Sequence, residues 1–150
     1  MDVIEKYKNP GAATDIIIEK SGRILLVRRK EEPFKGKLQF PAGFVNYGET
    51  IEHAAKREVK EETGLNIRLL DILGVYSHPK RDPRGHVIST VFIAEIINGN
   101  PTVNDKKEIE SVAFYDIKKL KKKELAFDNF RMIQDYLRYK KKKETFWSTK

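Results

Sequence analysis

One segment of this 150-residue chain, residues 51–63, constrains the fold more than any other part of the sequence. It contains neither Gly nor Pro and is rich in Ala, Glu and Lys, while Thr50 is a suitable N-cap and Gly64 a suitable C-terminal stop. We therefore predict an α-helix here. At about 100° per residue, the side expected to face solvent carries Glu52, Lys56, Lys60 and Thr63. The opposite side, expected to be buried, carries Ile51, Ala54, Ala55, Glu58, Glu61 and Glu62.

Three carboxylates on a helix side that should be buried need a compensating charge. Glu58 and Glu62, four residues apart, repel by about 0.2–0.5 kcal/mol in an exposed helix and by more when partly buried. They also lie in the last two turns, where the negative end of the helix dipole disfavours anions. Mg²⁺ or Mn²⁺ would supply the missing charge, since hard divalent cations bind carboxylates. The alternative is a surface helix whose acids face water.

Composition limits the kind of metal site and the kind of partner. The chain has no cysteine, which excludes disulfides, thiolate zinc sites and a cysteine nucleophile, so any metal must be held by oxygen or histidine. A net charge of +8 favours anionic partners such as nucleotides. Lysines cluster within residues 118–123 and 140–143. We interpret these clusters as solvated surface, not as a nucleic-acid site.

Branched and aromatic residues alternate with turn residues around the helix and predict strands on both sides of it. The predicted strands are residues 12–19, 23–28, 38–45, 67–76, 87–97 and 112–115. A final helix is expected to start near Asp128 and to bury Phe130, Ile133 and Leu137. This order indicates a single α/β sandwich domain. Residues 140–150 are expected to be a loose, basic tail.

The residues in and before the helix carry a specific resemblance. Gly43, five residues, Glu49, seven residues, Arg57-Glu58-Val59, one residue, Glu61-Glu62, one residue and Gly64-Leu65 match the complete Nudix box. The chain thus resembles the Nudix hydrolases, from about Ala12 to the last helix. The likeness implies a three-layer α/β/α sandwich around a mixed β-sheet, formed by residues 1–139. Leu38 and Ala42 depart from the family, where many members have Trp and Gly.

The family's pattern also implies roles for individual residues. Glu58, Glu62 and the backbone carbonyl of Ala42 would bind metal, Glu61 would bind metal or activate water, and Glu49 is a weaker candidate ligand. Divalent cations bridging a pyrophosphate would neutralise it and orient water for in-line attack. Arg57 is placed to pair with Glu61 and to fix the direction of its carboxylate. Glu108 and Glu110 are the candidates for the general base, although either acid could simply be solvated.

The substrate prediction depends on residues 77–86, whose sequence Ser-His-Pro-Lys-Arg-Asp-Pro-Arg-Gly-His resembles a segment of the prokaryotic ADP-ribose pyrophosphatase branch. Arg81, Arg84 and His86 could bind phosphate or ribose oxygens, and Arg28 is another possible phosphate contact. The expected reaction converts ADP-ribose to AMP and ribose 5-phosphate. One alternative is hydrolysis of an oxidised nucleoside triphosphate such as 8-oxo-dGTP. Another is a nucleotide-sensing or nucleic-acid-binding protein, against which the complete box argues.

The cellular location is predicted from the lack of long apolar segments, and the oligomeric state from the family resemblance. The sequence has no apolar run of membrane-spanning length and no signal-peptide core near Met1, so we expect a cytoplasmic protein without a membrane partner. A nucleic-acid partner is not expected. Relatives of the ADP-ribose type are frequently dimers, and the resemblance therefore implies a homodimer.

Overall fold

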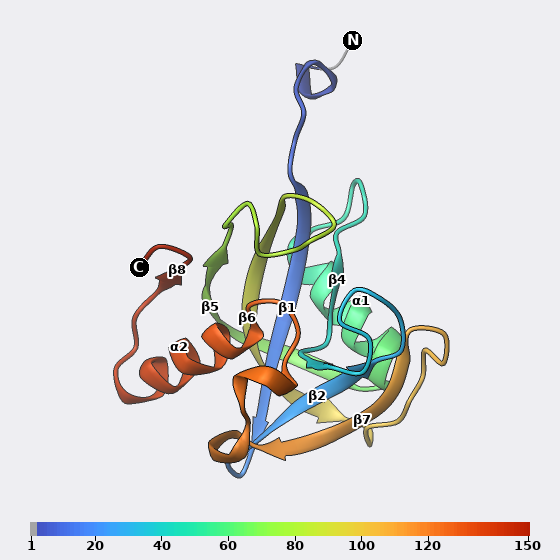
Figure 1. Cartoon of the computed structure of the whole chain (residues 1–150). Helices are drawn as coiled ribbons and strands as arrows, with labels where there is room; N and C mark the ends of the chain where they lie inside the picture. The colour runs from blue at the N-terminus through green and yellow to red at the C-terminus, as the bar shows by residue number, and fades with distance from the viewer. Residues whose placement is uncertain (1–2) are drawn as a thin grey trace.

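The computed structural model describes residues 3–150, which form a mixed β-sheet with a helix on each face (Figure 1). In chain order the elements are η1 (Val3–Lys6), β1 (Gly11–Lys20), β2 (Arg23–Arg29), β3 (Leu38–Gln39), β4 (Ala42–Phe44), α1 (Ile51–Thr63), β5 (Asn66–Tyr76), β6 (Val87–Asn98), β7 (Ile109–Asp116), η2 (Ile117–Lys119), η3 (Lys122–Glu124), α2 (Asn129–Lys141) and β8 (Phe146–Trp147). The strand and helix order confirms the predicted α/β fold.

Strand β1 lies at the centre of the sheet, whose order is β3-β2-β1-β6-β5-β8, with β4 also paired to β1 and β7 to β2. The β1–β6 pair is parallel, and β5 pairs with β6 antiparallel. Both faces of β1 are buried, as a central strand requires. Ile17 packs in the core on the α2 side, whereas Ile16 and Ile18 pack in the core on the α1 side. The sheet therefore separates two cores, one beneath each helix.

Helix α1 begins and ends where the sequence predicted. The Thr50 side chain accepts a hydrogen bond from the His53 N–H, and Gly64 ends the helix in the left-handed conformation at φ 75°. Two predicted orientations on this helix are wrong. Thr63, expected to face solvent, is fully buried, and Glu61, expected on the buried side, is exposed. The reason is packing: the apolar stripe through Ala55 and Val59 sets the rotation of the helix on the sheet.

Two other predicted elements differ in detail. The irregular strand expected at residues 38–45 is interrupted at Phe40-Pro41 and forms two short strands, because Pro41 has no N–H to donate. Helix α2 buries Met132, Ile133 and Tyr136, while Leu137, predicted to be buried, is exposed.

The segment after α2 is not the loose tail that we expected. β8 pairs parallel with β5, and Phe146 is only 1% exposed. A Cβ atom at Gly74 would lie 2.1 Å from the Phe146 carbonyl oxygen, so only glycine allows the two backbones to approach this closely. Arg131 donates hydrogen bonds to the carbonyls of Ser148 and Lys150. This apolar and hydrogen-bonded anchoring outweighs the repulsion among the preceding lysines.

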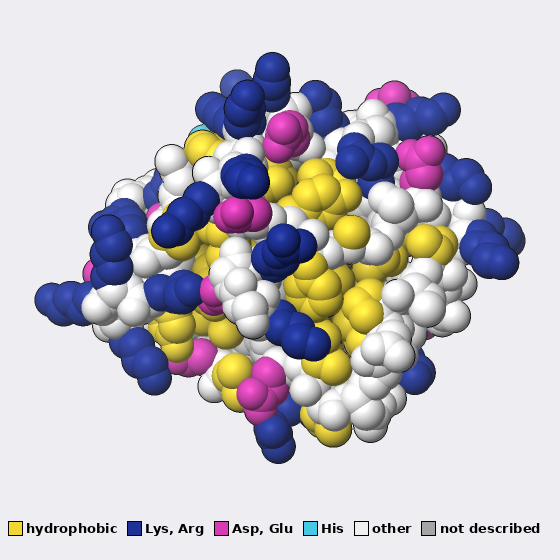
Figure 2. Space-filling model, turned by 90° about the horizontal axis from the view of Figure 1, so that it is seen from below, with side chains coloured by type: hydrophobic (Ala, Val, Ile, Leu, Met, Phe, Trp, Pro, Cys, Tyr) yellow, Lys and Arg dark blue, Asp and Glu magenta, His cyan; other side chains and the backbone are white. Residues whose placement is uncertain are grey.

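The face shown in Figure 2 carries many lysine and arginine side chains. In the view of Figure 2, they surround a group of apolar side chains. Among residues 3–150, no helix combines the length and the apolar composition needed to cross a bilayer.

Candidate active site

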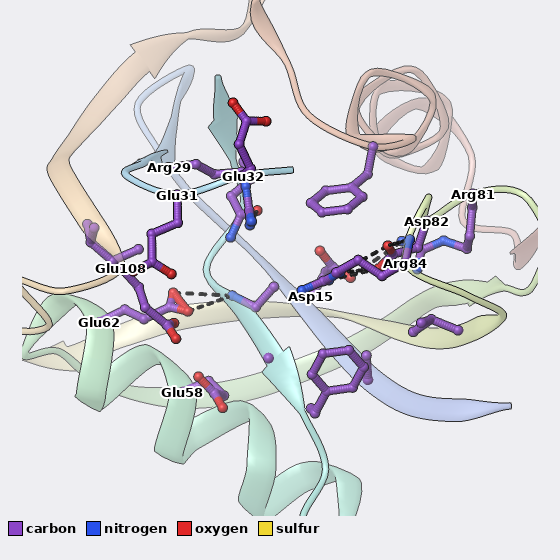
Figure 3. A pocket seen from close by; sticks show the side chains of 18 of the residues that line it. Asp15, Arg29, Glu31, Glu32, Glu58, Glu62, Arg81, Asp82, Arg84 and Glu108 are labelled. Atoms are coloured by element: carbon purple, nitrogen blue, oxygen red, sulfur yellow. Dashed lines mark hydrogen bonds and ion pairs between the residues drawn. The ribbon is translucent and has the colours of Figure 1, made fainter. Parts of the chain in front are cut away.

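A pocket of about 330 Å³ opens beside the N-terminal part of β4, between α1 and the loops that follow β2, β5 and β6. Its charged lining consists of seven acids and three arginines: Asp15, Glu31, Glu32, Glu58, Glu62, Asp82, Glu108, Arg29, Arg81 and Arg84. Figure 3 shows that Glu58, Glu62 and Glu108 gather at one end, while Arg81, Asp82 and Arg84 lie at the other. The pocket therefore offers an acidic end suited to cations and an arginine end suited to an anionic ligand.

Glu62 is the most buried carboxylate at the acidic end. Its side chain is 3% exposed, and both of its oxygens lie 3.4 Å from the Ala42 N–H, which is a long contact for a hydrogen bond. Burial raises the pKa of Glu62 well above its usual value, and the nearby charges of Glu58 and Glu108 add to the rise. A carboxylate in this position has strong need of a positive partner.

Glu58 lies against the backbone of β4 at Gly43. A Cβ atom at Gly43 would fall 2.0 Å from the Glu58 carboxyl carbon, so the glycine makes room for the carboxylate. Burial raises the pKa of Glu58, although the Arg57 guanidinium partly offsets the effect. The box glycine and the box glutamate are thus packed as one unit.

Arg57 fastens α1 to the loop before it. The guanidinium donates to both Glu49 oxygens at 2.7 and 2.9 Å, to the Phe44 carbonyl at 3.0 Å, and to Glu58 at 2.8 Å. Hydrogen bonds from Arg57 hold the pKa of Glu49 far below its usual value. The predicted pairing of Arg57 with Glu61 is present at 3.2 Å. The sequence did not reveal that Glu49 is the main partner of Arg57.

The oxygen ligands at the acidic end suit a hard divalent cation. Within residues 3–150, no three Asp, Glu or His side chains are close enough together in this conformation to hold a metal ion by themselves. Arg57 holds Glu58 toward itself, and Glu62 remains without a strong donor. Two carboxylates and a carbonyl suit Mg²⁺, which keeps several sites for water and phosphate oxygens.

The arginine end contains two ion pairs, Arg81 with Asp128 and Arg84 with Asp82, and the two arginine side chains differ in solvent exposure. The Arg81 side chain is 6% exposed and donates to both Asp128 oxygens at 3.0 and 2.8 Å. Arg84 is half exposed and donates in the same forked manner to Asp82. The Arg84 guanidinium carbon lies 5.3 and 5.5 Å from the ring centres of Phe44 and Phe127. Arg84 thus places a cation near two aromatic rings of the pocket lining.

A sequence profile of the NUDIX domain matches residues 8–136, which include both ends of this pocket. The chain belongs to the Nudix family.

Curated relatives and solved structures agree with this membership. Over 135 residues, this Nudix chain is 53% identical to the ADP-ribose pyrophosphatase of Methanocaldococcus jannaschii, an alignment that covers 89% of the chain and 77% of that protein. A putative 8-oxo-dGTP diphosphatase of Bacillus subtilis is 43% identical over 84 residues, which are 56% of the chain and 52% of that protein. The crystal structure of a MutT Nudix hydrolase from Burkholderia pseudomallei superimposes with a TM-score of 0.78 at 26% identity, covering 85% of the chain and 98% of that structure.

The Nudix pocket brings together most of the residues predicted for the site. Six of them line it: Ala42, Glu58, Glu62, Arg81, Arg84 and Glu108. Arg57 acts on the pocket through Glu58, whereas the Glu61 side chain is 55% exposed and lies outside the lining. Glu110 is exposed and also lies outside it. His86 faces Ser77, with its Nε2 atom 3.0 Å from the Ser77 carbonyl.

Arg28 is placed away from the Nudix pocket, and its neighbour Arg29 lines the pocket instead. Successive residues of a strand point to opposite faces, so only one of the two arginines can face each side. Arg29 donates to Gln39 at 2.8 Å and to the Pro33 carbonyl at 2.6 Å. The sequence offered no signal for the choice, because β2 is apolar on both faces. Asp15 and Phe127 were missed for a related reason, since they reach the pocket through long-range packing.

Proposed function

We propose that this Nudix hydrolase cleaves ADP-ribose to AMP and ribose 5-phosphate, using Mg²⁺ at the acidic end of the pocket. The observation that carries the proposal is the juxtaposition, in one pocket, of the poorly compensated Glu62 and its neighbour Glu58 with the half-exposed Arg84. A pyrophosphate between two organic groups needs cations at its phosphates and donors along its length. The 53% identity to the Methanocaldococcus jannaschii ADP-ribose pyrophosphatase supports ADP-ribose as that substrate.

The proposed metal ligands at the acidic end are Glu58, Glu62 and the Ala42 carbonyl. Glu61 would join them as a ligand once its ion pair with Arg57 is broken. An ion held there would neutralise phosphate charge and favour attack by water. Arg57 is a positioning residue, because it holds Glu58 and the end of β4, the strand that carries Gly43.

Glu108 is the proposed general base. It lines the pocket on the wall that faces Glu62 (Figure 3). Glu108 would accept a proton from the attacking water as the new P–O bond forms and the bond to the leaving phosphate breaks. Glu110, two residues later, does not line the pocket and is not included in this proposal.

At the other end, Arg84 is the proposed substrate contact. Its forked pairing with Asp82 leaves the outer face of the guanidinium accessible, and the rings of Phe44 and Phe127 beside it offer planar surfaces for a base. Arg81 is committed to Asp128 and buried, so we propose that it shapes the loop rather than binding the substrate through free donors.

Product analysis with Mg²⁺ tests the proposal across ADP-ribose, diadenosine polyphosphates, sugar nucleotides and 8-oxo-dGTP. We expect AMP and ribose 5-phosphate from ADP-ribose, with loss of the reaction in Glu62→Gln and retention in Glu52→Gln, whose side chain is exposed on the same helix. Preferred cleavage of 8-oxo-dGTP would support the second candidate, which is favoured by the 43% identity to the Bacillus subtilis protein. Absence of metal-dependent hydrolysis of every compound would refute both.

We also propose a homodimer. Large apolar side chains are exposed along β5 and β8, namely Leu70, Ile72, Val75 and Trp147. A second copy covering these side chains would remove them from water. Light scattering during size-exclusion chromatography would give twice the mass of the 17.4 kDa chain if the proposal is correct.

A further inference from the structure

A second hollow of about 700 Å³ lies on the other face of β2, between β7 and the segment that contains η2 and η3. It is lined by Arg28, which the reaction does not use, and by Lys119 and Lys123 of the lysine cluster at residues 118–123. The cations in the lining are Arg23, Arg28, Lys37, Lys119 and Lys123. The hollow therefore collects basic residues that are far apart in the chain.

These five cations lack carboxylate partners. In the described part of the chain, none of them lies within ion-pair distance of an acid. Arg28 donates to the Gly36 carbonyl at 2.8 Å, and Lys37 donates to the Lys123 carbonyl at 2.5 Å. Clustered cations without counter-charges create a local positive potential that attracts anions.

The two acids in the lining are engaged by backbone groups instead. Asp116 accepts the Lys118 N–H at 2.9 Å and Glu124 accepts the Lys121 N–H at 3.2 Å. Both carboxylates serve to shape the η2 and η3 turns. With five cations against two acids, the hollow keeps an excess of three positive charges.

The hollow also has an apolar part. Leu38, Leu120 and the ring of Tyr115 line it, and the buried Leu38 side chain belongs to the core on the α2 side. The volume falls within the roughly 300–1,000 Å³ that small-molecule sites occupy. Basic groups beside an aromatic and aliphatic wall match a ligand that combines phosphate with a planar ring.

We propose that this hollow is a second nucleotide site, separate from the active pocket, which takes the phosphates of a free nucleotide on Arg28, Lys119 and Lys123 and its base against Tyr115. The two hollows have no lining residue in common, and adjacent residues of β2, Arg28 and Arg29, face one each. Occupancy of the second site does not require that ADP-ribose be the substrate.

Binding of ADP in the presence of EDTA, which prevents hydrolysis, tests the proposal by NMR and calorimetry. In ¹⁵N-labelled full-length chain, the amides of Lys37, Tyr115 and Leu120 are expected to shift. Calorimetry should give an ADP site that Lys119→Glu/Lys123→Glu weakens by at least about tenfold, since each tenfold step corresponds to about 1.4 kcal/mol.

Lys141→Glu/Lys142→Glu is the matched control, because it makes the same charge change at exposed lysines outside the hollow. It should leave ADP binding unchanged. Equal weakening by both double variants would show a general charge effect and overturn the site. Shifts confined to amides of the active pocket, such as Gly43 and Asp82, would also overturn it. Inorganic pyrophosphate bound as tightly as ADP would refute the nucleotide assignment, since the apolar wall would then contribute nothing.

Discussion

The Glu62 carboxyl group is buried beside Glu58, with only long contacts to the Ala42 N–H. Burial raises the pKa of Glu62, so the folded state binds its proton more tightly than the unfolded chain, and without metal stability is lost as pH rises above the usual pKa. Glu62→Gln is therefore expected to raise the melting temperature at pH 7.5 in EDTA. The same substitution should lower Mg²⁺-dependent kcat by at least about 100-fold, equivalent to about 2.7 kcal/mol of lost transition-state stabilisation.

The pH dependence and a matched control make this prediction specific. A carboxyl group with a raised pKa in the folded state is protonated in both states at low pH, so the gain in melting temperature should shrink toward pH 4. Glu52→Gln removes an exposed carboxylate from the same helix and should change neither quantity appreciably. A destabilised Glu62→Gln protein in EDTA would contradict the account of Glu62.

Asp15 is a second buried carboxylate of the pocket. Burial raises its pKa from 3.8 to about 6, although Arg81 and the Ser89 hydroxyl, which donates to it, partly offset the rise. At about 1.4 kcal/mol per pKa unit, the rise in the Asp15 pKa corresponds to about 3 kcal/mol of lost folding stability once the group is ionised. In EDTA, Asp15→Asn is therefore expected to stabilise the fold by up to about 3 kcal/mol above pH 6, measured by urea denaturation.

The sign of the Asp15 effect follows from linkage. The folded state binds the Asp15 proton more tightly than the unfolded chain, so stability falls as pH rises from about 4 to 6 and stays low above that range. The advantage of Asp15→Asn should accordingly vanish below about pH 4. A constant advantage across pH 4–8 would mean that the charge of Asp15 is not its cause.

Single residues were predictable where fixed spacing carries the chemistry. Glu58 and Glu62 could be assigned to one site because four residues along a helix place them on one face. Arg29 and Phe127 could not, because the contacts that bring them to the pocket join segments about 100 residues apart. The metal and catalytic roles themselves stay predictions.

Helix α1 and the loop before it act as one element because Arg57 binds both. Lysine has a single ammonium group and cannot make the forked pair with Glu49 or hold the Phe44 carbonyl at the same time. Arg57→Lys is therefore expected to lower Mn²⁺ affinity, measured by electron paramagnetic resonance, and kcat by about 10–100-fold, as is usual for residues that orient a metal ligand.

Stability should also fall in Arg57→Lys, with a defined pH range. Arg57 lowers the pKa of Glu49, so the stabilisation is complete above the usual value of 4.5 and is lost as pH falls through the lower folded value. The difference in urea midpoint between parent and variant should be largest at pH 6–8 and should narrow below about pH 4.5. A difference that grows on acidification would refute the role of Glu49.

Elements were predicted well where their signals are local. Thr50, Gly64 and the composition between them define both ends of α1 without reference to the rest of the chain. The face of α2 was predicted less well, because the neighbours of Leu137 depend on how the helix lies across the sheet. The rotation of an amphipathic helix with several polar positions is a tertiary property.

At the scale of the whole molecule, the parallel pairing of β1 with β6 joins residues about 75 positions apart. Runs of branched and aromatic residues predicted both strands but could not predict that the strands pair. The same limitation applies to the C-terminus, where Phe146 and Trp147 follow four lysines and resemble a solvated tail. The division into a domain of residues 1–139 and a tail of residues 140–150 stays a prediction, although β8 joins the sheet.

Phe146 shows how far this C-terminal segment contributes to the fold. Its ring is buried in the core on the α2 side, with the cations of Arg138 and Lys150 within 5.3 and 4.8 Å of the ring centre. Phe146→Ala is expected to reduce the free energy of unfolding by about 3–5 kcal/mol, as for other fully buried phenylalanines. The adjacent Trp147 is 49% exposed, so Trp147→Ala should cost clearly less in the same urea titration. Equal costs for the two substitutions would show that the segment adheres to the sheet without joining the core.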